Sequence, residues 1–475
     1  MKKGDIVEVS IESYAFEGKG VAKVQLEGTP DDKKFTVFVE GAYPGDTVKA
    51  FIRKKKKNYA EAKIEEILVK SPERIDARCN FFQNCGGCKQ QDLDYKIQTK
   101  YKQAQVTETF EHIGGLTDFE NEEIIAGKNQ FFYRNKMEYS FSDKRWIPKE
   151  ELNSEEEITD RNFALGLHIP RIFDKVLDID ECFLMSELSN KILNATRNFF
   201  KSRGVSVYNT RNHVGYLRNL VIKESHFTHD LMVNLVTHED NPELMKEYTE
   251  QLLSEVPQIT TVINNVNTRK AQVALGDYEK VYHGDGYIYD QIGEYKYRIS
   301  ANSFFQTNTL QAQPLYQTAL DYADIKKEDI VYDLYSGAGT ISLYISKFAK
   351  KVYAIESVEP AVEDAKMNSK FNNVDNVEFI LGDLNKSFLP VIKEQNIPNP
   401  DIVIADPPRS GMNPKTVKDL LKIAPKRIVY VSCNPASQVR DITMLIEGGY
   451  KLKKIRPVDM FPQTYHIENV ALLEK

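Results

Sequence analysis

Hydrophobic and polar residues alternate over short runs in the first 70 residues or so of the chain. Asp5–Ile11 and Lys34–Val39 are two such runs, and turn-forming residues such as Glu27–Asp31 separate runs of this kind. A period of two indicates half-buried strands, and turns at short intervals are typical of a closed or sandwiched sheet. Residues 1–70 are therefore expected to form a small β-barrel.

A helical period follows over residues 92–113. Apolar side chains recur there three to five positions apart, at Leu93, Ile97, Tyr101, Val106, Phe110 and Ile113. Asp92 is a candidate N-cap and Gly114–Gly115 a candidate stop. The pattern predicts one long amphipathic helix, for which the C-terminal domain described below is a possible packing surface.

Residues 130–295 combine strand-like and helix-like segments. The runs that predict strands lie at 136–141, 217–222, 231–236 and 261–264, and those that predict helices lie near 184–200 and 242–256. The acidic stretch from Glu150 to Asp160 is expected to be an exposed loop. This mixture is typical of an α+β domain.

From residue 328 onward, strands and helices alternate regularly. Five apolar runs predict strands, at 330–334, 352–355, 377–380, 402–405 and 428–431. Such alternation indicates a mainly parallel, doubly wound sheet, which is the Rossmann-like α/β class. We therefore divide the chain into residues 1–70, 71–295 and 296–475, with the Rossmann-like domain last.

Composition agrees with several soluble domains. The 475 residues correspond to about three domains at roughly 150 residues each. Hydrophobic residues make up 41% and charged residues 28%, and no apolar run approaches the ~18 residues that a membrane span needs. We expect a cytoplasmic protein that binds no membrane.

The net charge of −6 argues mildly against a uniformly basic surface for nucleic acid. One local run, Arg53–Lys57 followed by Tyr59, places cations beside an aromatic ring and could contact RNA. A solvated surface run is the commoner meaning of such a segment when it stands alone.

Residues that could carry chemistry follow the predicted parallel strands, where ligands of doubly wound sheets bind. They are the glycine-rich turn Tyr335–Thr340, Glu356, Asp383, Asp406 and Cys433. Glu356 is placed where a carboxylate can accept from two ribose hydroxyls. The turn lacks a third glycine and a Gly-Lys-Ser/Thr sequence, which disfavours cofactors held by their phosphates. A nucleoside cofactor without phosphates, such as S-adenosylmethionine, fits better.

Cys433 would then lie beside a methyl donor. A lone cysteine is more often a small buried hydrophobic residue than a nucleophile. Next to a methyl donor, however, a thiolate can add to C6 of uracil and make C5 nucleophilic. The C5 proton must afterwards be removed by a base.

The C-terminal half resembles the RNA uracil-5 methyltransferases of the RumA/TrmA family. Five stretches carry the resemblance: Ser303–Asn308, Asp333–Thr340, Asp406–Arg409, Ser432–Pro435 and Asp459–Glu468. The resemblance implies Cys433 as nucleophile, Glu468 as base and Phe304 as a residue stacking on the target base. It also implies that S-adenosylmethionine binds among Gln306, Tyr335, Thr340, Glu356, Asp383 and Asp406. Residues 1–70 likewise resemble the TRAM domain, an RNA-binding barrel.

The remaining cysteines form a second candidate site. Cys79, Cys85 and Cys88 cluster, and Cys182 stands apart. Spacing alone leaves a zinc site and an iron–sulfur cluster as alternatives. The lack of a neighbouring histidine favours a site whose ligands are all cysteine thiolates. The RumA-like branch carries a [4Fe–4S] cluster with this spacing, so the resemblance implies that cluster with Cys182 as fourth ligand.

Together these features predict S-adenosylmethionine-dependent methylation of uracil C5 in 23S rRNA, with RNA as partner and no obligate protein partner. A tRNA uracil-5 methyltransferase is the nearest alternative. An amino-group methyltransferase would have no use for Cys433. A non-catalytic RNA-binding protein on the same fold is the alternative from another class.

Overall fold

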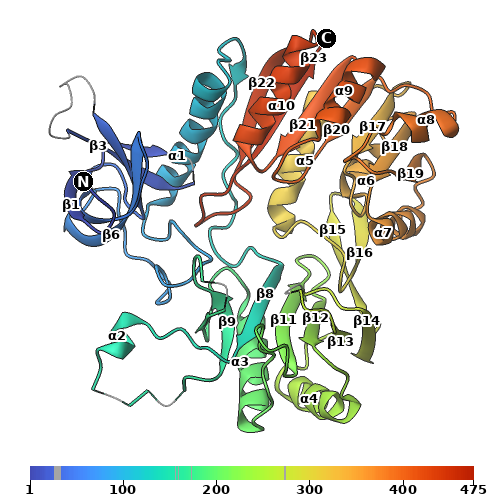
Figure 1. The fold of residues 1–475 in the computed structure, drawn as a ribbon. Coiled ribbons are helices and arrows are strands. Elements are labelled where there is room, and N and C mark those ends of the chain that lie inside the picture. Colours follow the sequence, from blue (N-terminus) through green and yellow to red (C-terminus); the bar gives the residue numbers. More distant parts are fainter. Residues whose placement is uncertain (16, 26–33, 156, 159, 173, 272–273) are drawn as a thin grey trace.

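The computed structural model describes residues 1–15, 17–25, 34–155, 157–158, 160–172, 174–271 and 274–475. The predicted turn at Glu27–Asp31 lies outside these ranges. Figure 1 shows the N-terminal sheet and the C-terminal domain on either side of helix α1, with the middle sheet below them. Within the described residues, no helix is long and apolar enough to span a membrane.

The N-terminal part is a six-stranded sheet, which confirms the predicted β-barrel. The strands follow the order β1-β5-β6-β4-β3-β2. Alternating side chains fill its interior, and Val37, Val39, Val48 and Ile52 are completely buried there. The strands are β1 Ile6–Ser10, β2 Ser13–Ala15, β3 Lys19–Val24, β4 Phe35–Glu40, β5 Thr47–Lys55 and β6 Tyr59–Val69.

The predicted long helix is present as α1, Tyr95–Glu108, which continues into a π-helical turn, η1, Thr109–Ile113. The expected cap at Asp92 is wrong. Asp94 caps the helix by accepting from the Lys96 amide at 2.9 Å, whereas the Asp92 carboxylate pairs with Arg74. Packing of this segment on the C-terminal domain is observed, because Phe110 lies in the hydrophobic cluster of that domain.

The middle of the chain forms a seven-stranded sheet with the order β10-β9-β8-β11-β12-β13-β14. The helices α3 (Glu187–Ser202) and α4 (Pro242–Glu255) pack on one face around Phe199, Phe200 and Tyr248. The acidic stretch expected as a loop contains a short helix, α2, Lys149–Leu152. The strands are β8 Lys136–Ser142, β9 Ala164–His168, β10 Val176–Asp178, β11 Leu217–Glu224, β12 Leu231–Thr237, β13 Thr261–Val266 and β14 Tyr278–His283. A separate hairpin follows, β15 Tyr287–Ile292 and β16 Tyr295–Ser300.

The C-terminal sheet has the order β19-β18-β17-β20-β21-β23-β22-β7. The first five strands are parallel, which confirms the Rossmann-like fold. The strand β23 pairs antiparallel with β21, and β22 pairs antiparallel with β23. These strands are β17 Ile330–Leu334, β18 Lys351–Glu356, β19 Val377–Leu381, β20 Ile402–Ala405, β21 Arg427–Ser432, β22 Lys451–Val458, β23 Glu468–Glu474 and the short β7, Glu120–Asn121.

Helices cover both faces of this sheet (Figure 1). One hydrophobic cluster joins the sheet to α5 (Thr309–Ala323), α6 (Thr340–Ser346) and α7 (Glu359–Phe371). A second cluster joins the other face to α8 (Leu389–Glu394), α9 (Pro414–Ile423), α10 (Pro435–Glu447) and η1. The carboxyl ends of the parallel strands remain open toward the middle sheet.

Candidate active site

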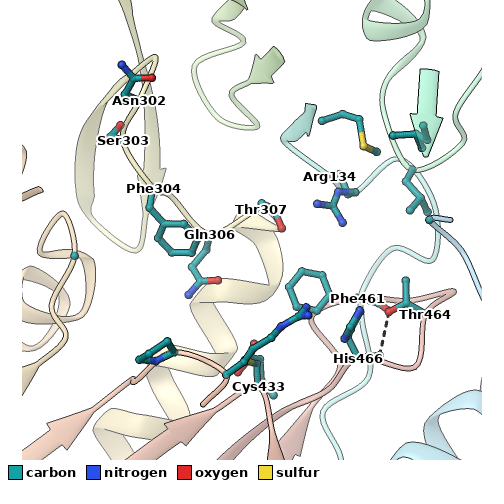
Figure 2. Close-up of a pocket in the computed structure, with 18 of the residues that line it drawn as sticks. Arg134, Asn302, Ser303, Phe304, Gln306, Thr307, Cys433, Phe461, Thr464 and His466 are labelled. Carbon is teal, nitrogen blue, oxygen red and sulfur yellow. Dashed lines mark hydrogen bonds between the residues drawn. The ribbon is translucent and has the colours of Figure 1, made fainter. Parts of the chain in front are cut away.

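A cavity of about 1530 Å³ lies at the carboxyl ends of the parallel strands. Both the C-terminal domain and the middle sheet contribute to its wall, and Figure 2 shows side chains from both around the same space. Of the predicted site residues, those that line it are Cys79, Cys85, Cys88, Cys182, Phe304, Gln306, Tyr335, Thr340, Glu356, Asp406, Cys433 and Glu468. The fold therefore brings together residues that are as far apart as 79 and 468 in sequence.

Asp383 is the predicted site residue that does not line the cavity. Its exposed carboxylate accepts from the Asn385 amide at 2.9 Å and pairs with Lys386 at 3.1 Å. These two contacts lower the pKa of Asp383. In this conformation the Asp383 carboxylate therefore contacts neighbouring residues of its own loop and not the cavity.

The glycine-rich turn after β17 has an unusual backbone. Tyr335, Gly337 and Gly339 all have positive φ, at 66°, 53° and 78°. A side chain at Gly339 would also lie 2.8 Å from the Phe379 ring, so both conformation and space require glycine. Glu356 holds the turn by accepting from the Gly337 amide at 3.0 Å. The turn and the acidic residue after β18 therefore form one unit.

Thr340 begins α6 directly after this turn. Its hydroxyl shares a hydrogen bond of 2.8 Å with the Tyr316 hydroxyl, and its carbonyl accepts from Tyr297 at 3.1 Å. Two buried tyrosines from the neighbouring hairpin and helix therefore fix the N-terminus of α6.

The sequence reasoning missed Asp333 as a site residue, although it stands at the end of β17 just before the turn. It is completely buried, and one oxygen accepts from the Ser342 hydroxyl while Oδ1 has no partner among the described residues. Burial, with a smaller contribution from Asp406, raises the pKa of Asp333 to about 7. The nearby Ser336 hydroxyl is also without a partner in the described part of the chain. Unpartnered buried polar atoms of this kind indicate a ligand or water above them.

Cys433 follows β21 and is half-buried. Burial raises the pKa of its thiol to about 11; Glu468 and Asp406 raise it, and Arg409 lowers it. The backbone of Arg409 is held beside Cys433, because its carbonyl accepts from Asn434 at 2.9 Å and Ser437 at 3.1 Å. The turn after β20 and the turn after β21 are thus tied together around the thiol.

Two carboxyl groups accompany Cys433. Glu468 is 8% exposed at the first position of β23, and burial raises its pKa well above the usual range, with Asp406 adding to the effect. Burial also raises the pKa of Asp406 to about 7. Two neighbouring acids in one buried site cannot both ionise easily, which favours one shared proton between them.

His466 lies at the end of the loop that leads to Glu468, two residues before it, and lines the cavity with Phe461 (Figure 2). Burial lowers the pKa of His466 to about 4, and the cations Arg409, Lys102 and Arg134 lower it further. At neutral pH its imidazole is therefore uncharged and can act as a neutral donor or acceptor.

The loop 459–467, which precedes Glu468, is held by α1. Lys102 pairs with Asp459 at 2.7 Å, both completely buried, and also donates to the Phe461 carbonyl at 3.1 Å. Gln98 donates to the Gln463 side chain at 3.0 Å. Because buried polar groups need specific partners, this network fixes the loop in one position.

The loop 300–308, which carries Phe304 and Gln306, is held by the middle sheet. Lys223 donates to the carbonyls of Ser300 at 2.7 Å and Ser303 at 2.9 Å. Asn135 donates to the Gln306 carbonyl at 2.7 Å. Phe304 itself is 66% exposed at the cavity. The middle sheet thus sets the backbone of a loop whose aromatic ring is free to meet a ligand.

The four predicted metal ligands meet at another part of the cavity wall. All are free thiols. Burial, with smaller contributions from Cys182, Cys85 and Cys79, raises the pKa of Cys88 to about 12. All four cysteines line the cavity. Among the described residues, no three His, Cys, Asp or Glu side chains lie close enough to hold a single metal ion.

Comparison with known proteins agrees with this arrangement. A family model described as tRNA (uracil-5-)-methyltransferase matches residues 211–475, and a TRAM domain model matches residues 1–64. An RNA methyltransferase of Chlorobaculum tepidum is 43% identical, matching 100% of this chain and 97% of the relative. One of Bacteroides thetaiotaomicron is 39% identical, matching 97% of this chain and 99% of the relative.

A solved structure is similar over nearly the whole chain. It is the Pyrococcus abyssi tRNA (uracil-54, C5)-methyltransferase in complex with S-adenosyl-L-homocysteine. The TM-score is 0.73 at 29% identity, covering 98% of this chain and 99% of the other. With one family model across more than half of its residues and relatives matched along its length, the chain belongs to the tRNA (uracil-5-)-methyltransferase family of S-adenosylmethionine-dependent RNA methyltransferases, with an N-terminal TRAM domain.

Proposed function

We propose that this protein methylates C5 of a uracil in 23S rRNA, with Cys433 as nucleophile and Glu468 as base. The observation that carries the proposal is the placement of both residues on one cavity wall, next to the glycine-rich turn after β17. An enzyme that methylated an exocyclic nitrogen would need no thiol in this position.

The donor site would consist of the turn 335–340, Glu356, Gln306 and Asp406. S-adenosylmethionine supplies an electrophilic methyl group on a positively charged sulfur. The residues present fit such a ligand, because Glu356 and Asp406 line the cavity, and Asp333, whose charge interacts with both, has an Oδ1 without a partner among the described residues. Asp383 would contact the donor only if its carboxylate broke the ion pair with Lys386.

In the first step, the Cys433 thiolate forms a bond to C6 of the uracil. The C5–C6 π electrons move toward the C4 carbonyl and give an enolate, whose C5 would take the methyl group from the donor sulfur and leave S-adenosylhomocysteine. Glu468 next removes the C5 proton, the C5–C6 double bond re-forms, and the C6–sulfur bond breaks to return the thiolate. The raised pKa of Glu468 makes its ionised form a stronger base for that proton.

Phe304 would stack on the target base once the uridine has left its RNA fold. Its ring is exposed at the cavity, while its loop is fixed from below by Lys223. Single-stranded bases are commonly recognised in this way, by an aromatic face held on rigid backbone.

The position of the transferred methyl group tests the chemistry. The protein is incubated with methyl-labelled donor and total RNA from cells that lack it, and the RNA is digested to nucleosides. Label in 5-methyluridine supports the proposal. Label on an exocyclic nitrogen would identify an amino-group methyltransferase, and RNA binding without label would identify a non-catalytic protein.

Separating the labelled RNA by size tests the substrate. Label in 23S rRNA is the proposed result, which follows from the resemblance of the cysteine set to the rRNA-modifying branch. Label in tRNA is the alternative, and the similarity to the Pyrococcus abyssi tRNA enzyme favours it. That similarity covers the TRAM barrel as well, so the barrel does not separate the two substrates.

We further propose that Cys79, Cys85, Cys88 and Cys182 hold a [4Fe–4S] cluster. All four cysteines line the cavity, and among the described residues no three of them lie close enough to hold a single ion. A cluster of four irons holds its thiolates farther apart than one ion does. Protein purified without oxygen should contain iron and acid-labile sulfide in about a 1:1 ratio. Stoichiometric zinc without iron would contradict the assignment.

The division into residues 1–70, 71–295 and 296–475 stays a proposal, as does the cytoplasmic location. Three large sheets, formed mainly by residues 6–69, 136–283 and 330–474, support three parts. The bounds fit less well, because β7 of the middle range joins the C-terminal sheet and residue 295 is the first residue of β16. Limited proteolysis, with cleavage expected near residues 70 and 295, would test it.

A further inference from the structure

A cluster of aromatic rings surrounds one arginine beside the catalytic cavity. The Arg78 guanidinium lies 5.3 Å from the ring centre of Phe131, 4.9 Å from that of Phe132 and 4.4 Å from that of Phe183. We call these four residues the aromatic platform. None of the roles assigned above uses it.

The platform is continuous with the cavity. Phe183 lines the cavity, and so does Cys79, the neighbour of Arg78. Arg134, two residues after Phe132, also lines it and points into the space between Thr307 and His466 (Figure 2). A chain that enters the cavity from this side therefore passes over the platform.

The outer part of the platform is open to solvent. Phe132 is 40% exposed and Arg78 is exposed, and Arg78 forms no ion pair with the carboxylates that the structure describes. Because none of the described carboxylates neutralises the Arg78 guanidinium, it stays available to an anionic ligand.

The backbone holds Phe132 in this exposed position. Its φ is 54°, a conformation that bulky residues rarely adopt. The Phe132 amide donates to the Phe183 carbonyl at 2.8 Å, and the Arg134 amide donates to the Leu184 carbonyl at 2.9 Å. The ring centre of Phe132 lies 6.2 Å from that of Phe183, and the two rings are nearly perpendicular. An exposed phenylalanine in this uncommon backbone conformation lowers the stability of the fold, and such strain is typical of functional sites.

We propose that the aromatic platform stacks a nucleotide that flanks the target uridine, an inference that rests on the proposed function. Exposed aromatic faces beside arginine and lysine are the usual means of holding single-stranded RNA without reading its sequence. Lys128 and Arg134 add positive charge on the same segment, whereas Asp180 and Glu181 lie on the Cys79 side. The base therefore stacks on the Phe132 side, and its phosphates face the cations.

The test measures binding of a fluorescein-labelled twelve-residue oligouridylate by anisotropy, with the holoprotein, at several salt concentrations. Replacing Phe132 with Ala should weaken binding about tenfold without changing its salt dependence, because stacking releases no counterions. Phe132→Tyr should keep the affinity. Phe227→Ala removes a ring that is 43% exposed and does not line the cavity, and serves as the matched control with unchanged binding.

Binding of S-adenosylhomocysteine, measured by calorimetry, shows whether each variant keeps its fold. If Phe132→Ala does not bind S-adenosylhomocysteine, the oligouridylate measurement is made with Phe132→Leu instead, because leucine keeps the apolar bulk without an aromatic face. Unchanged oligouridylate affinity in a folded Ala or Leu variant overturns the platform. If these variants bind oligouridylate weakly and the native protein makes no 5-methyluridine, the result supports the aromatic platform and contradicts only the proposed methylation of C5.

Discussion

At the scale of single residues, Cys433 combines its proposed role as nucleophile with a thiol that is hard to ionise. Its pKa of about 11 means that little thiolate exists at neutral pH in the empty cavity. Alkylation of Cys433 by iodoacetamide should therefore accelerate about tenfold per pH unit between pH 7 and 10. Peptide mapping by mass spectrometry measures this rate, and a rate that is flat above pH 7 would show a thiol already ionised.

Asp333 should make donor binding depend on pH. Its carboxyl is protonated below a pKa of about 7 and ionised above it. The donor is cationic, so it should bind the ionised form more tightly, and affinity should rise roughly tenfold from pH 6 to pH 8. Calorimetry with the native protein and with Asp333→Asn tests this. The Asn variant should lose most of the dependence, and an equal pH dependence in both would assign the effect to another group such as Asp406.

At the scale of elements, α1 positions the loop that leads to Glu468. Replacing Lys102 with Met leaves Asp459 buried without its partner, which typically costs about 3–5 kcal/mol. Amide exchange in residues 459–468 should accelerate, and methylation should fall while donor binding persists. The double variant with Asp459→Asn removes the unpaired charge and should recover part of the loss. Unchanged exchange in the single variant would mean that the loop holds its position without α1.

Sequence predicted the elements well where their signals are local. The five parallel strands follow from short apolar runs, and the turn after β17 from its glycines. The C-terminal domain was expected to pack on α1, but the individual partner residues were not predictable, because Gln98 and Gln463, for example, are 365 residues apart. The wrong cap has a similar cause: Asp92 and Asp94 both suit a helix start, and Arg74, packed from the barrel side, decides between them.

At the scale of the whole molecule, the barrel is joined to the rest by buried polar contacts. Gln90, just before α1, donates to the Tyr14 hydroxyl at 3.0 Å. Of the basic run, Arg53 and Lys54 pair with Glu40 and Glu61, and Lys55 donates to the Met1 carbonyl at 2.7 Å. Lys56 and Lys57 are exposed and have no such partner among the described residues. Deleting residues 1–70 would therefore also uncover α1.

Replacing individual lysines tests RNA binding by the barrel more cleanly than deleting residues 1–70. If Lys56 and Lys57 contact phosphates, replacing both with Ala should reduce the slope of log affinity against log salt by about 1.4, since each contact with single-stranded RNA contributes roughly 0.7. Donor binding should not change. An unaltered slope would show that the run is an ordinary solvated surface.

The sites formed between domains were the least predictable part of the molecule. Family resemblance located Cys433 and Glu468, but not the support that Lys223 and Asn135 give to the Phe304 loop from the middle sheet. Such contacts depend on how the domains pack, for which a single sequence holds no periodic signal.

In the proposed reaction, Cys433 attacks the uracil and Glu468 releases the product. The most direct measurement follows Glu468→Gln with methyl-labelled donor and substrate RNA on a denaturing gel. Addition and methyl transfer should proceed but elimination should stall, giving a denaturant-resistant protein–RNA band that carries the label. The band should be absent when Cys433 is also replaced with Ala. Normal turnover of Glu468→Gln, or a labelled band that persists without Cys433, would contradict the account.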